Sequence, residues 1–200
     1  IGSIAFLSYN EHLIPKIRYS IFVEMVGLNN PLILQKSYNG NELINRYALT
    51  AMAELQGPSK SYPYLTVAGN DEKIFNAPGV NIPSISITRV NQEAKLNKKK
   101  EVQLGGENEL VLPYPEYHSH LDNIDNVDLQ RVNDAIEALY NLCHIIEKDF
   151  IPIRKFKGPA FLSKYDLWVD WRKNPGMSES VMWLMYLLEG DMTAFQIAER

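Results

Sequence analysis

The stretch IRYSIFVEMVG, residues 17–27, decides how the fold is interpreted. Isoleucine, phenylalanine and valine crowd its centre, which is typical of a buried strand. Further apolar runs of strand length follow at residues 31–38, 62–69 and 81–90. Between them, residues 41–56 place apolar side chains at helical spacing and end at Gly57 and Pro58. Strands that alternate with a helix predict a layered α/β fold.

Glu24 is a carboxylate inside the apolar run of the first of these strands. A carboxylate is costly to bury without a partner, so it needs a metal, another cation or a position at the end of the strand. Two interpretations stay open at this point. Glu24 either binds a cation or closes the strand and faces water.

The clearest helix is expected in residues 122–150, where apolar side chains recur at steps of three and four. The expected buried stripe consists of Leu129, Val132, Ile136, Leu139, Cys143 and Ile146. Cys143 is therefore expected to pack in the core, and Asp125 or Asn126 to cap the start of the helix.

Two short polar stretches could carry chemistry. PEYHSHLDNID, residues 115–125, contains His118, with Asp122 four residues later in a position to accept a hydrogen bond from its ring. His118 is a candidate metal ligand, and the alternative is a solvated loop histidine. In AGNDEK, residues 68–73, Asp71 and Glu72 follow an expected strand and could bind a metal or a substrate amine, or form a simple turn.

Composition and charge narrow the class of protein. Hydrophobic residues make up 46% and charged residues 22% of the chain, and the net charge is −4. These values fit a globular domain and argue against a general nucleic-acid surface. The run Lys98 to Lys100 is either a solvated loop or a small basic patch. The single cysteine cannot form an internal disulfide, so a cytoplasmic location is expected, and no apolar run reaches membrane-spanning length.

The last residues, 178–200, have the pattern of a helix, a turn at Gly190 and a second helix. Thr193 and Gln196 have the spacing of a capping box. A helix, tight turn and helix predict the start of a winged-helix-like module. The expected organisation is a main domain over residues 1–157, a linker over 158–177 and this module over 178–200.

Three of these features resemble the zinc aminopeptidases of the co-catalytic di-zinc family, to which glutaminyl cyclases are related. HSHLD, from His118, is similar to the family pattern His, Ser or Thr, two residues, Asp. NDEKIFNAPGVNIPSISI, from Asn70, is similar to the Ser-Asp-His turn, with Asn70 in place of Ser and Glu72 in place of His. VEMVG is similar to Asp-Met-hydrophobic-Gly, with Glu24 in place of the zinc-binding aspartate.

The whole chain also resembles bacterial aminopeptidase-like domain proteins, some of which are linked to polysaccharide biosynthesis. GSIA near residue 2, PEYH at 115–118 and IAER at 197–200 carry that resemblance. It implies an α/β fold with a three-layer αβα mixed sheet, followed by a winged-helix-like module.

The resemblance implies zinc as the cofactor, with Glu24 and His118 as ligands and Asp122 orienting His118. Asp71 and Glu72 would line the substrate cleft. The substrate implied is a small peptide or an amide-bearing compound. A homo-oligomer stays open, and neither a membrane nor a nucleic acid is an expected partner.

The family's general base and remaining ligands are expected upstream of Ile1. These 200 residues are therefore expected to be inactive as a hydrolase and to bind zinc weakly or not at all. The alternative function is a non-catalytic binding or scaffold protein that keeps the fold. A third, nucleic-acid binding through the winged helix, is disfavoured by the negative net charge.

Overall fold

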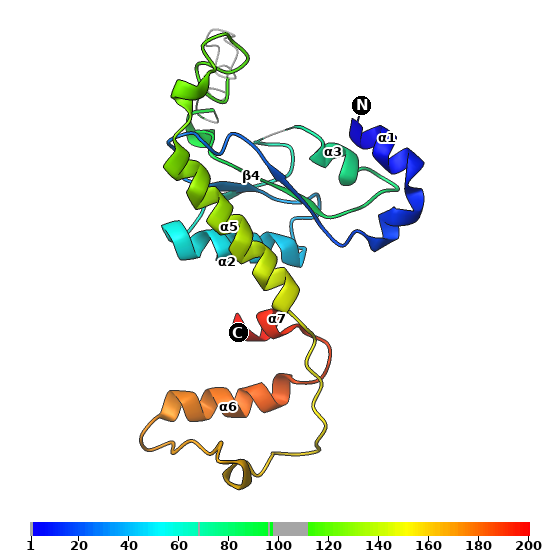
Figure 1. Ribbon diagram of the computed structural model, residues 1–200. Coiled ribbons are helices and arrows are strands. Elements are labelled where there is room, and N and C mark those ends of the chain that lie inside the picture. The colour runs from blue at the N-terminus through cyan, green and yellow to red at the C-terminus, as the bar shows by residue number, and fades with distance from the viewer. Residues whose placement is uncertain (1, 68, 96, 98–111) are drawn as a thin grey trace. The chain divides into compact units, whose positions relative to one another are not determined.

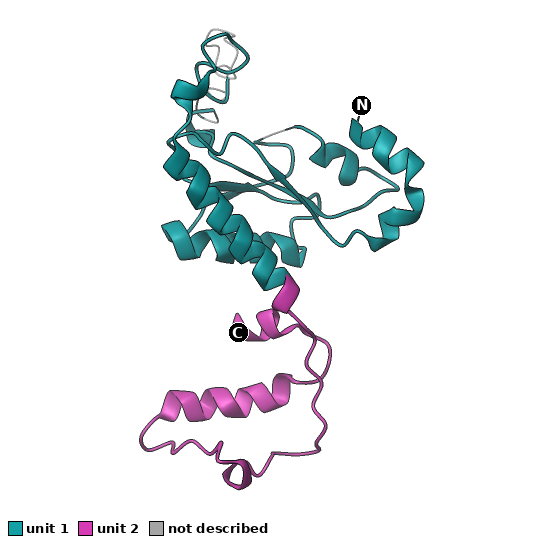
Figure 2. Cartoon of the chain, viewed as in Figure 1, with its two compact units in different colours: residues 1–146 teal, residues 147–200 magenta. Residues whose placement is uncertain are grey.

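The computed structural model describes residues 2–67, 69–95, 97 and 112–200. The interpretation of Lys98 to Lys100 lies outside these residues. The chain divides into two compact units, residues 1–146 and residues 147–200 (Figure 2). Both boundaries expected from the sequence, at 157 and 177, fall inside the second unit.

A four-stranded mixed sheet lies at the centre of the first unit (Figure 1). Its strands are β1 (Ser20–Val23), β2 (Ile33–Gln35), β3 (Ser61–Tyr62) and β4 (Ser84–Thr88), in the order β1-β4-β2-β3. β1 is parallel to β4 and β2 is parallel to β3, whereas β2 is antiparallel to β4. The predicted α/β class with a mixed sheet is confirmed.

The helices of the first unit connect and cover these strands. They are α1 (Gly2–Tyr9), η1 (Glu11–Lys16), α2 (Leu43–Gln56), α3 (Glu72–Phe75), η2 (Ile124–Asn126) and α5 (Leu129–Lys148), whose last residues belong to the second unit. The helix expected in residues 41–56 is confirmed, and Gly57 ends it with φ of 74°.

The strand expected over residues 62–69 is wrong beyond Tyr62. β3 stops there and the chain turns, with Leu65 at a φ of 59°. Pro63 follows β3 directly and has no N–H to donate to a neighbouring strand, which gives a physical reason for the stop.

Different helices cover the two faces of the sheet. Ser86 is paired with both Phe22 and Gln35, so these three side chains share one face. Phe22 contacts Phe75 with ring centroids 5.5 Å apart, and Gln35 donates a hydrogen bond to Glu72, so α3 covers this face. We call it the α3 face.

The opposite face carries the main hydrophobic core. Leu34, Ile85 and Ile87 point to this side and are at most 1% exposed. Five residues of α2 at helical spacing are completely buried: Ile44, Tyr47, Ala48, Ala51 and Met52. Tyr19, which precedes β1, contacts Tyr47 edge to face, so α2 covers this side of the sheet.

α5 buries a different stripe from the one expected. Its buried residues are Ala135, Ala138 and Leu142. Leu129 and Ile136 are 68% and 58% exposed, and Cys143 is exposed too, so the expected core position of Cys143 is wrong. Small alanine side chains therefore make up most of the buried side of this helix.

The start of α5 also differs from the expectation. The Asp128 carboxylate accepts a hydrogen bond from the Gln130 backbone N–H at 2.8 Å, so Asp128 caps the helix. Asp125 and Asn126, the expected caps, belong to η2 instead.

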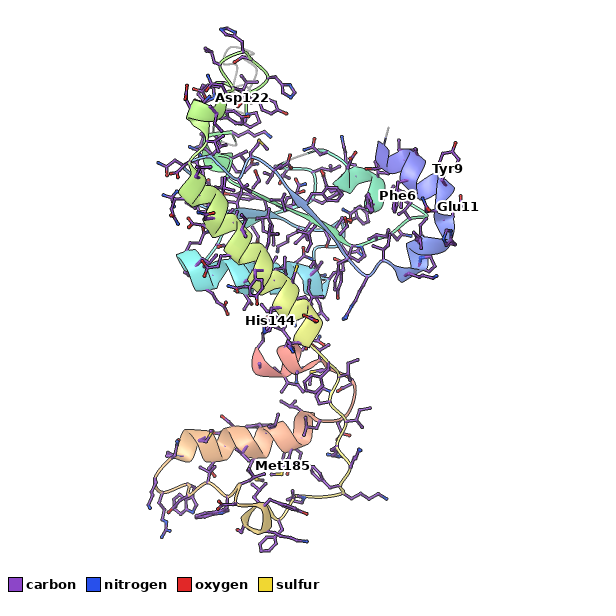
Figure 3. All side chains as sticks on the ribbon, in the orientation of Figure 1. Phe6, Tyr9, Glu11, Asp122, His144 and Met185 are labelled. Atoms are coloured by element: carbon purple, nitrogen blue, oxygen red, sulfur yellow. The ribbon has the colours of Figure 1, made fainter. Side chains whose placement is uncertain are left out.

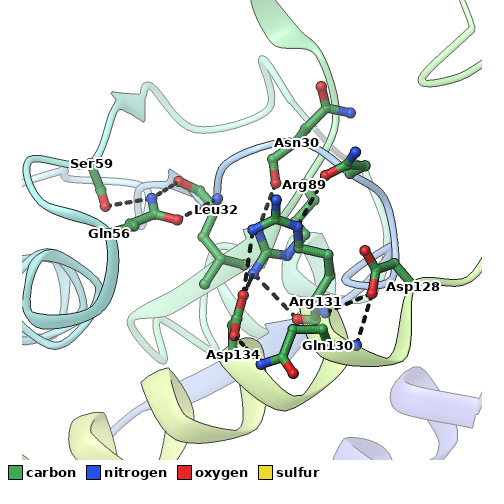
Figure 4. Close-up of polar contacts among 10 residues, drawn as sticks. Asn30, Leu32, Gln56, Ser59, Arg89, Asp128, Gln130, Arg131 and Asp134 are labelled. Atoms are coloured by element: carbon green, nitrogen blue, oxygen red, sulfur yellow. Dashed lines mark hydrogen bonds and ion pairs between the residues drawn. The ribbon is translucent and has the colours of Figure 1, made fainter.

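Arg89, directly after β4, contacts α5 through a hydrogen bond and an ion pair (Figure 4). Its guanidinium donates to the carbonyls of Asn30 at 2.6 Å and Arg131 at 3.2 Å, and lies 3.6 Å from the Asp134 carboxylate. Burial lowers the pKa of Arg89, and the Asp134 charge opposes that shift. This buried cation holds the loop after β1 against the helix.

The second unit contains η3 (Leu162–Tyr165), α6 (Pro175–Leu187) and α7 (Ala194–Ala198). The predicted capping box is confirmed, because the Thr193 side chain accepts from the Gln196 N–H and the Gln196 side chain accepts from the Thr193 N–H. A single bridge pairs Ile153 with Glu189. Within residues 147–200, all of which the structure describes, Thr193 is the only buried residue.

In the described part of the chain, no helix combines the length and the apolar character that crossing a bilayer requires.

Candidate functional site

Glu24 lies directly after the last residue of β1, on the α3 face of the sheet. Its backbone N–H donates to the carbonyl of Ile87 at 3.2 Å, which continues the pairing with β4. Met25 then turns the chain with a φ of 52°. The side-chain amide of Asn70 donates to Oε2 of Glu24, whereas Oε1 is buried and has no hydrogen-bond partner among the described residues.

The surroundings of Glu24 favour its neutral form. Burial raises the pKa of this carboxyl, and the nearby charge of Glu72 raises it further. The hydrogen bond from Asn70 and the charge of Lys95 act in the opposite direction but do not cancel the rise. A cation placed at Oε1 would restore the charged form.

Glu72 begins α3 and is completely buried. Each of its carboxylate oxygens lies 3.0 Å from the backbone nitrogen of Asn70, and Oε1 lies 3.4 Å from the side-chain amide of Gln35. Asp71, the preceding residue, is exposed. The adjacent carboxylates of Asp71 and Glu72 therefore occupy different environments. Asp71 faces solvent, whereas Glu72 is buried against the sheet.

His118 and Asp122 lie in the loop that leads to α5, in which Figure 3 labels Asp122. His118 is exposed, has a φ of 58° and stacks on Tyr117 with ring centroids 3.9 Å apart. Asp122 accepts a hydrogen bond from the Tyr114 hydroxyl at 2.7 Å. Burial and this hydrogen bond raise the pKa of Tyr114 to about 12.

The structure thus brings some of the predicted residues together and not others. Glu24 and Glu72 meet through Asn70 at one end of the sheet. Among the described residues, no hydrogen bond or ion pair joins Asp122 to His118, or either of them to Glu24. Within the same residues no three His, Cys, Asp or Glu side chains are grouped as a metal site.

Sequence reasoning missed the buried hydroxyls of β4, Ser86 and Thr88, which are completely buried on the α3 face beside the carboxylates. Their signal was present in the strand SISIT, residues 84–88, where hydroxyl residues alternate with isoleucine. Alternation places every second side chain on one face, so three hydroxyls had to face the same side.

The chain is similar in fold to a protein of known structure. Over 98% of its length the chain matches a crystal structure named "putative peptidase" from Clostridium acetobutylicum, with a TM-score of 0.72 and 18% sequence identity. The chain covers 40% of the length of that protein. At this identity the likeness shows the fold alone.

The sequence itself gives one more specific match. Residues 1–97 match the family described as "Domain of unknown function (DUF4910)". This part of the chain contains the whole sheet, Glu24 and Glu72. No curated protein matches the chain.

Proposed function

We propose that the chain is part of a peptidase-like hydrolase that acts on peptide or amide bonds, with zinc as its metal. The fold likeness to the Clostridium acetobutylicum protein supports the hydrolase class, since that protein is named a "putative peptidase". In this proposal the sheet and its helices form the three-layer αβα arrangement of such enzymes, and α6, Gly190 and α7 begin a winged-helix-like module.

The observation that carries the proposal is the carboxylate of Glu24. It lies at the carboxyl end of a parallel strand, the edge at which α/β proteins bind their ligands. One of its oxygens is buried without a donor, and burial raises its pKa. A carboxylate in that state is completed either by a proton or by a cation, and a metal ion is the cation that hydrolysis of an amide can use.

Each predicted site residue has a role in the proposal. Glu24 and His118 bind the zinc, Asp122 orients His118, and Asp71 and Glu72 line the cleft for a small peptide or amide-bearing substrate. Bound zinc supplies a Lewis acid and lowers the pKa of a coordinated water.

The residues around Glu24 fit zinc only in part. The neighbouring donors are carboxylate, amide and hydroxyl oxygens, whereas zinc prefers nitrogen and sulfur ligands. His118 is the nitrogen donor that the proposal assigns, and its ring is exposed and stacks on Tyr117.

A non-catalytic binding or scaffold protein is the second candidate. The exposed, stacked state of His118 favours it, as does the absence of a three-residue metal group from the described part of the chain. The link to polysaccharide biosynthesis stays a prediction of the resemblance.

The test is zinc content and hydrolysis of aminoacyl anilides by the full-length gene product. His118→Ala and Glu24→Gln are expected to lose zinc and nearly all activity, and Asp122→Asn to lose about 10- to 100-fold in zinc affinity. His120→Ala is the matched control, because His120 lies two residues away and is left free by the family pattern. Absent zinc and absent hydrolysis in the unmutated protein would move the assignment to the binding protein.

A further inference from the structure

The α3 face of the sheet is polar, and several of its oxygen atoms lack partners. Ser84, Ser86 and Thr88 of β4 are all completely buried there. The Ser84 hydroxyl donates to the carbonyl of Ile82 at 2.8 Å. The hydroxyl oxygens of Ser86 and Thr88 have no hydrogen-bond partner in the described part of the chain. Buried hydroxyls without partners are rare and costly, so each one calls for an explanation.

The strand register places the two carboxylates next to these hydroxyls. Val23 is paired with Ile87, so Glu24, one residue later, lies beside Thr88 on the same face. On the other side Ser86 is paired with Gln35, whose side-chain amide donates to Glu72. Glu24, Thr88, Ser86 and Glu72 therefore face one small region between β1, β4 and α3.

The two carboxylates of this region act on each other, because the charge of Glu72 raises the pKa of Glu24. The hydrogen bonds that Glu72 accepts come from neutral amides, the Asn70 backbone and the Gln35 side chain. The Lys95 charge lowers the pKa of Glu24, and its ammonium donates to the carbonyl of Val67 at 2.9 Å. Two carboxylates in partly buried surroundings destabilise each other unless something positive lies between them.

We propose that Glu24, Glu72, Ser86 and Thr88 form a site for one hard divalent cation of the Mg²⁺, Mn²⁺ and Ca²⁺ class. All the donors are oxygens, which is the ligand set these ions prefer. The ion neutralises both carboxylates and coordinates the buried oxygen of Glu24 and both hydroxyls, and water completes its shell. Glu24 is only half-buried, so the site is open to solvent on that side.

This inference rests on the proposed function only in that both use Glu24. It differs in its metal class and in its other ligands, because neither His118 nor Asp71 takes part. The rival occupants of the same space are a proton shared by the two carboxylates or an ordinary buried water.

The experiment is titration of the metal-free chain with Mn²⁺, followed by electron paramagnetic resonance and by thermal unfolding. We expect saturable binding of one ion and a rise in the unfolding temperature. Glu72→Gln is expected to weaken binding by about tenfold or more, and Thr88→Val, which replaces the hydroxyl by a methyl of similar size, by a smaller factor. Asp125→Asn and His120→Ala are the matched controls and are expected to bind Mn²⁺ normally, because neither residue belongs to either proposed site.

Three outcomes overturn the proposal. They are the absence of saturable Mn²⁺ binding, equal thermal stabilisation of the unmutated chain and Glu72→Gln, and a loss with Asp125→Asn as large as with Glu72→Gln. Should Glu72→Gln fail to fold, as judged by circular dichroism, the Thr88→Val comparison decides alone, and an unchanged affinity overturns the site.

Mn²⁺ and zinc binding, measured on the same variants, distinguish the oxygen-ligand site from the zinc hydrolase of the proposed function. Loss of zinc but retention of Mn²⁺ in His118→Ala supports both proposals. Retained Mn²⁺ binding in a protein that neither binds zinc nor hydrolyses anilides supports the oxygen site and overturns only the zinc assignment.

Discussion

The two units of the chain differ in how they are held together. The buried apolar side chains are all in the first unit, from Leu7 to Leu142. In the second unit even the apolar helix α6 contains no buried residue, and Trp168, Trp171 and Trp183 are each more than half exposed. The second unit is held together by local contacts, such as the caps of α6 and α7 and the ion pair between Arg154 and Glu189 at 2.6 Å.

The difference shows that apolar content alone does not make a core. Burial of apolar surface is the main favourable term in folding, so the first unit should account for most of the unfolding free energy. The second unit should open at a much lower free energy, because few of its apolar groups are removed from water.

The largest expected effect tests that comparison directly. Leu34 is completely buried in β2, so Leu34→Ala should lower the unfolding free energy by about 2–5 kcal/mol. Leu184 of α6 is 44% exposed, and Leu184→Ala should change the unfolding free energy by no more than about 0.5 kcal/mol. Urea unfolding followed by circular dichroism measures both. Losses of equal size would show that the second unit has a core after all.

A pair of glycines sharpens the comparison at a smaller scale. A Cβ on Gly27 would meet Cγ1 of Val127 at 2.8 Å, so Gly27→Ala should cost about 1–3 kcal/mol by forcing the loop after β1 away from Val127, between η2 and α5. A Cβ on Gly176 in α6 would meet nothing within 4 Å, and Gly176→Ala should stabilise that helix by up to about 1 kcal/mol.

Thermal unfolding measures the first change, and amide hydrogen exchange in α6 measures the second. A neutral Gly27→Ala would mean that Val127 moves aside freely and that the contact between the loop after β1 and the segment before α5 is loose.

The smallest expected effect is on the pH dependence of the first unit. Because the pKa of Glu24 is raised in the folded chain, the folded form binds this proton more tightly than the unfolded form does. The contribution of this group to stability is therefore present at low pH. It is lost as the pH rises from the ordinary pKa of 4.5 through the raised value.

Glu24→Gln removes that contribution, so the variant should gain stability relative to the unmutated chain as the pH rises through this window. Urea unfolding at a series of pH values, with divalent cations removed, measures the difference. A constant difference across the window would show that Glu24 titrates normally.

Much of the first unit could be predicted from local patterns. The helix that became α2 has buried residues at 44, 47, 48, 51 and 52, the spacing that a single apolar face requires. The capping box at Thr193 is likewise a local pattern, and it formed as expected. Such features depend on residues within a turn or two of each other.

The wrong prediction of the buried face of α5 has a different cause, since it depends on contacts between distant segments. In α5 both faces contain apolar residues at helical spacing, and the structure buries Ala135 and Ala138 but leaves Ile136 and Cys143 exposed. Periodicity could not choose between these faces, because it does not encode how closely a helix approaches its neighbour.

The candidate site shows the same limit. The sequence left open whether Glu24 binds a cation or closes the strand, and the meeting of Glu24 with Asn70 joins residues 46 positions apart. The placement of His118 as a zinc ligand stays a prediction, since it depends on where a long loop directs one side chain.

The exposed position of Cys143 has a practical consequence. It is the chain's only cysteine, so a maleimide or nitroxide reagent should label the protein at one known point of α5 without any mutation. The same thiol can join two chains through an intermolecular disulfide in air. A dimer seen without a reductant would then be an oxidation product, and any measurement of self-association has to be made with the thiol reduced or blocked.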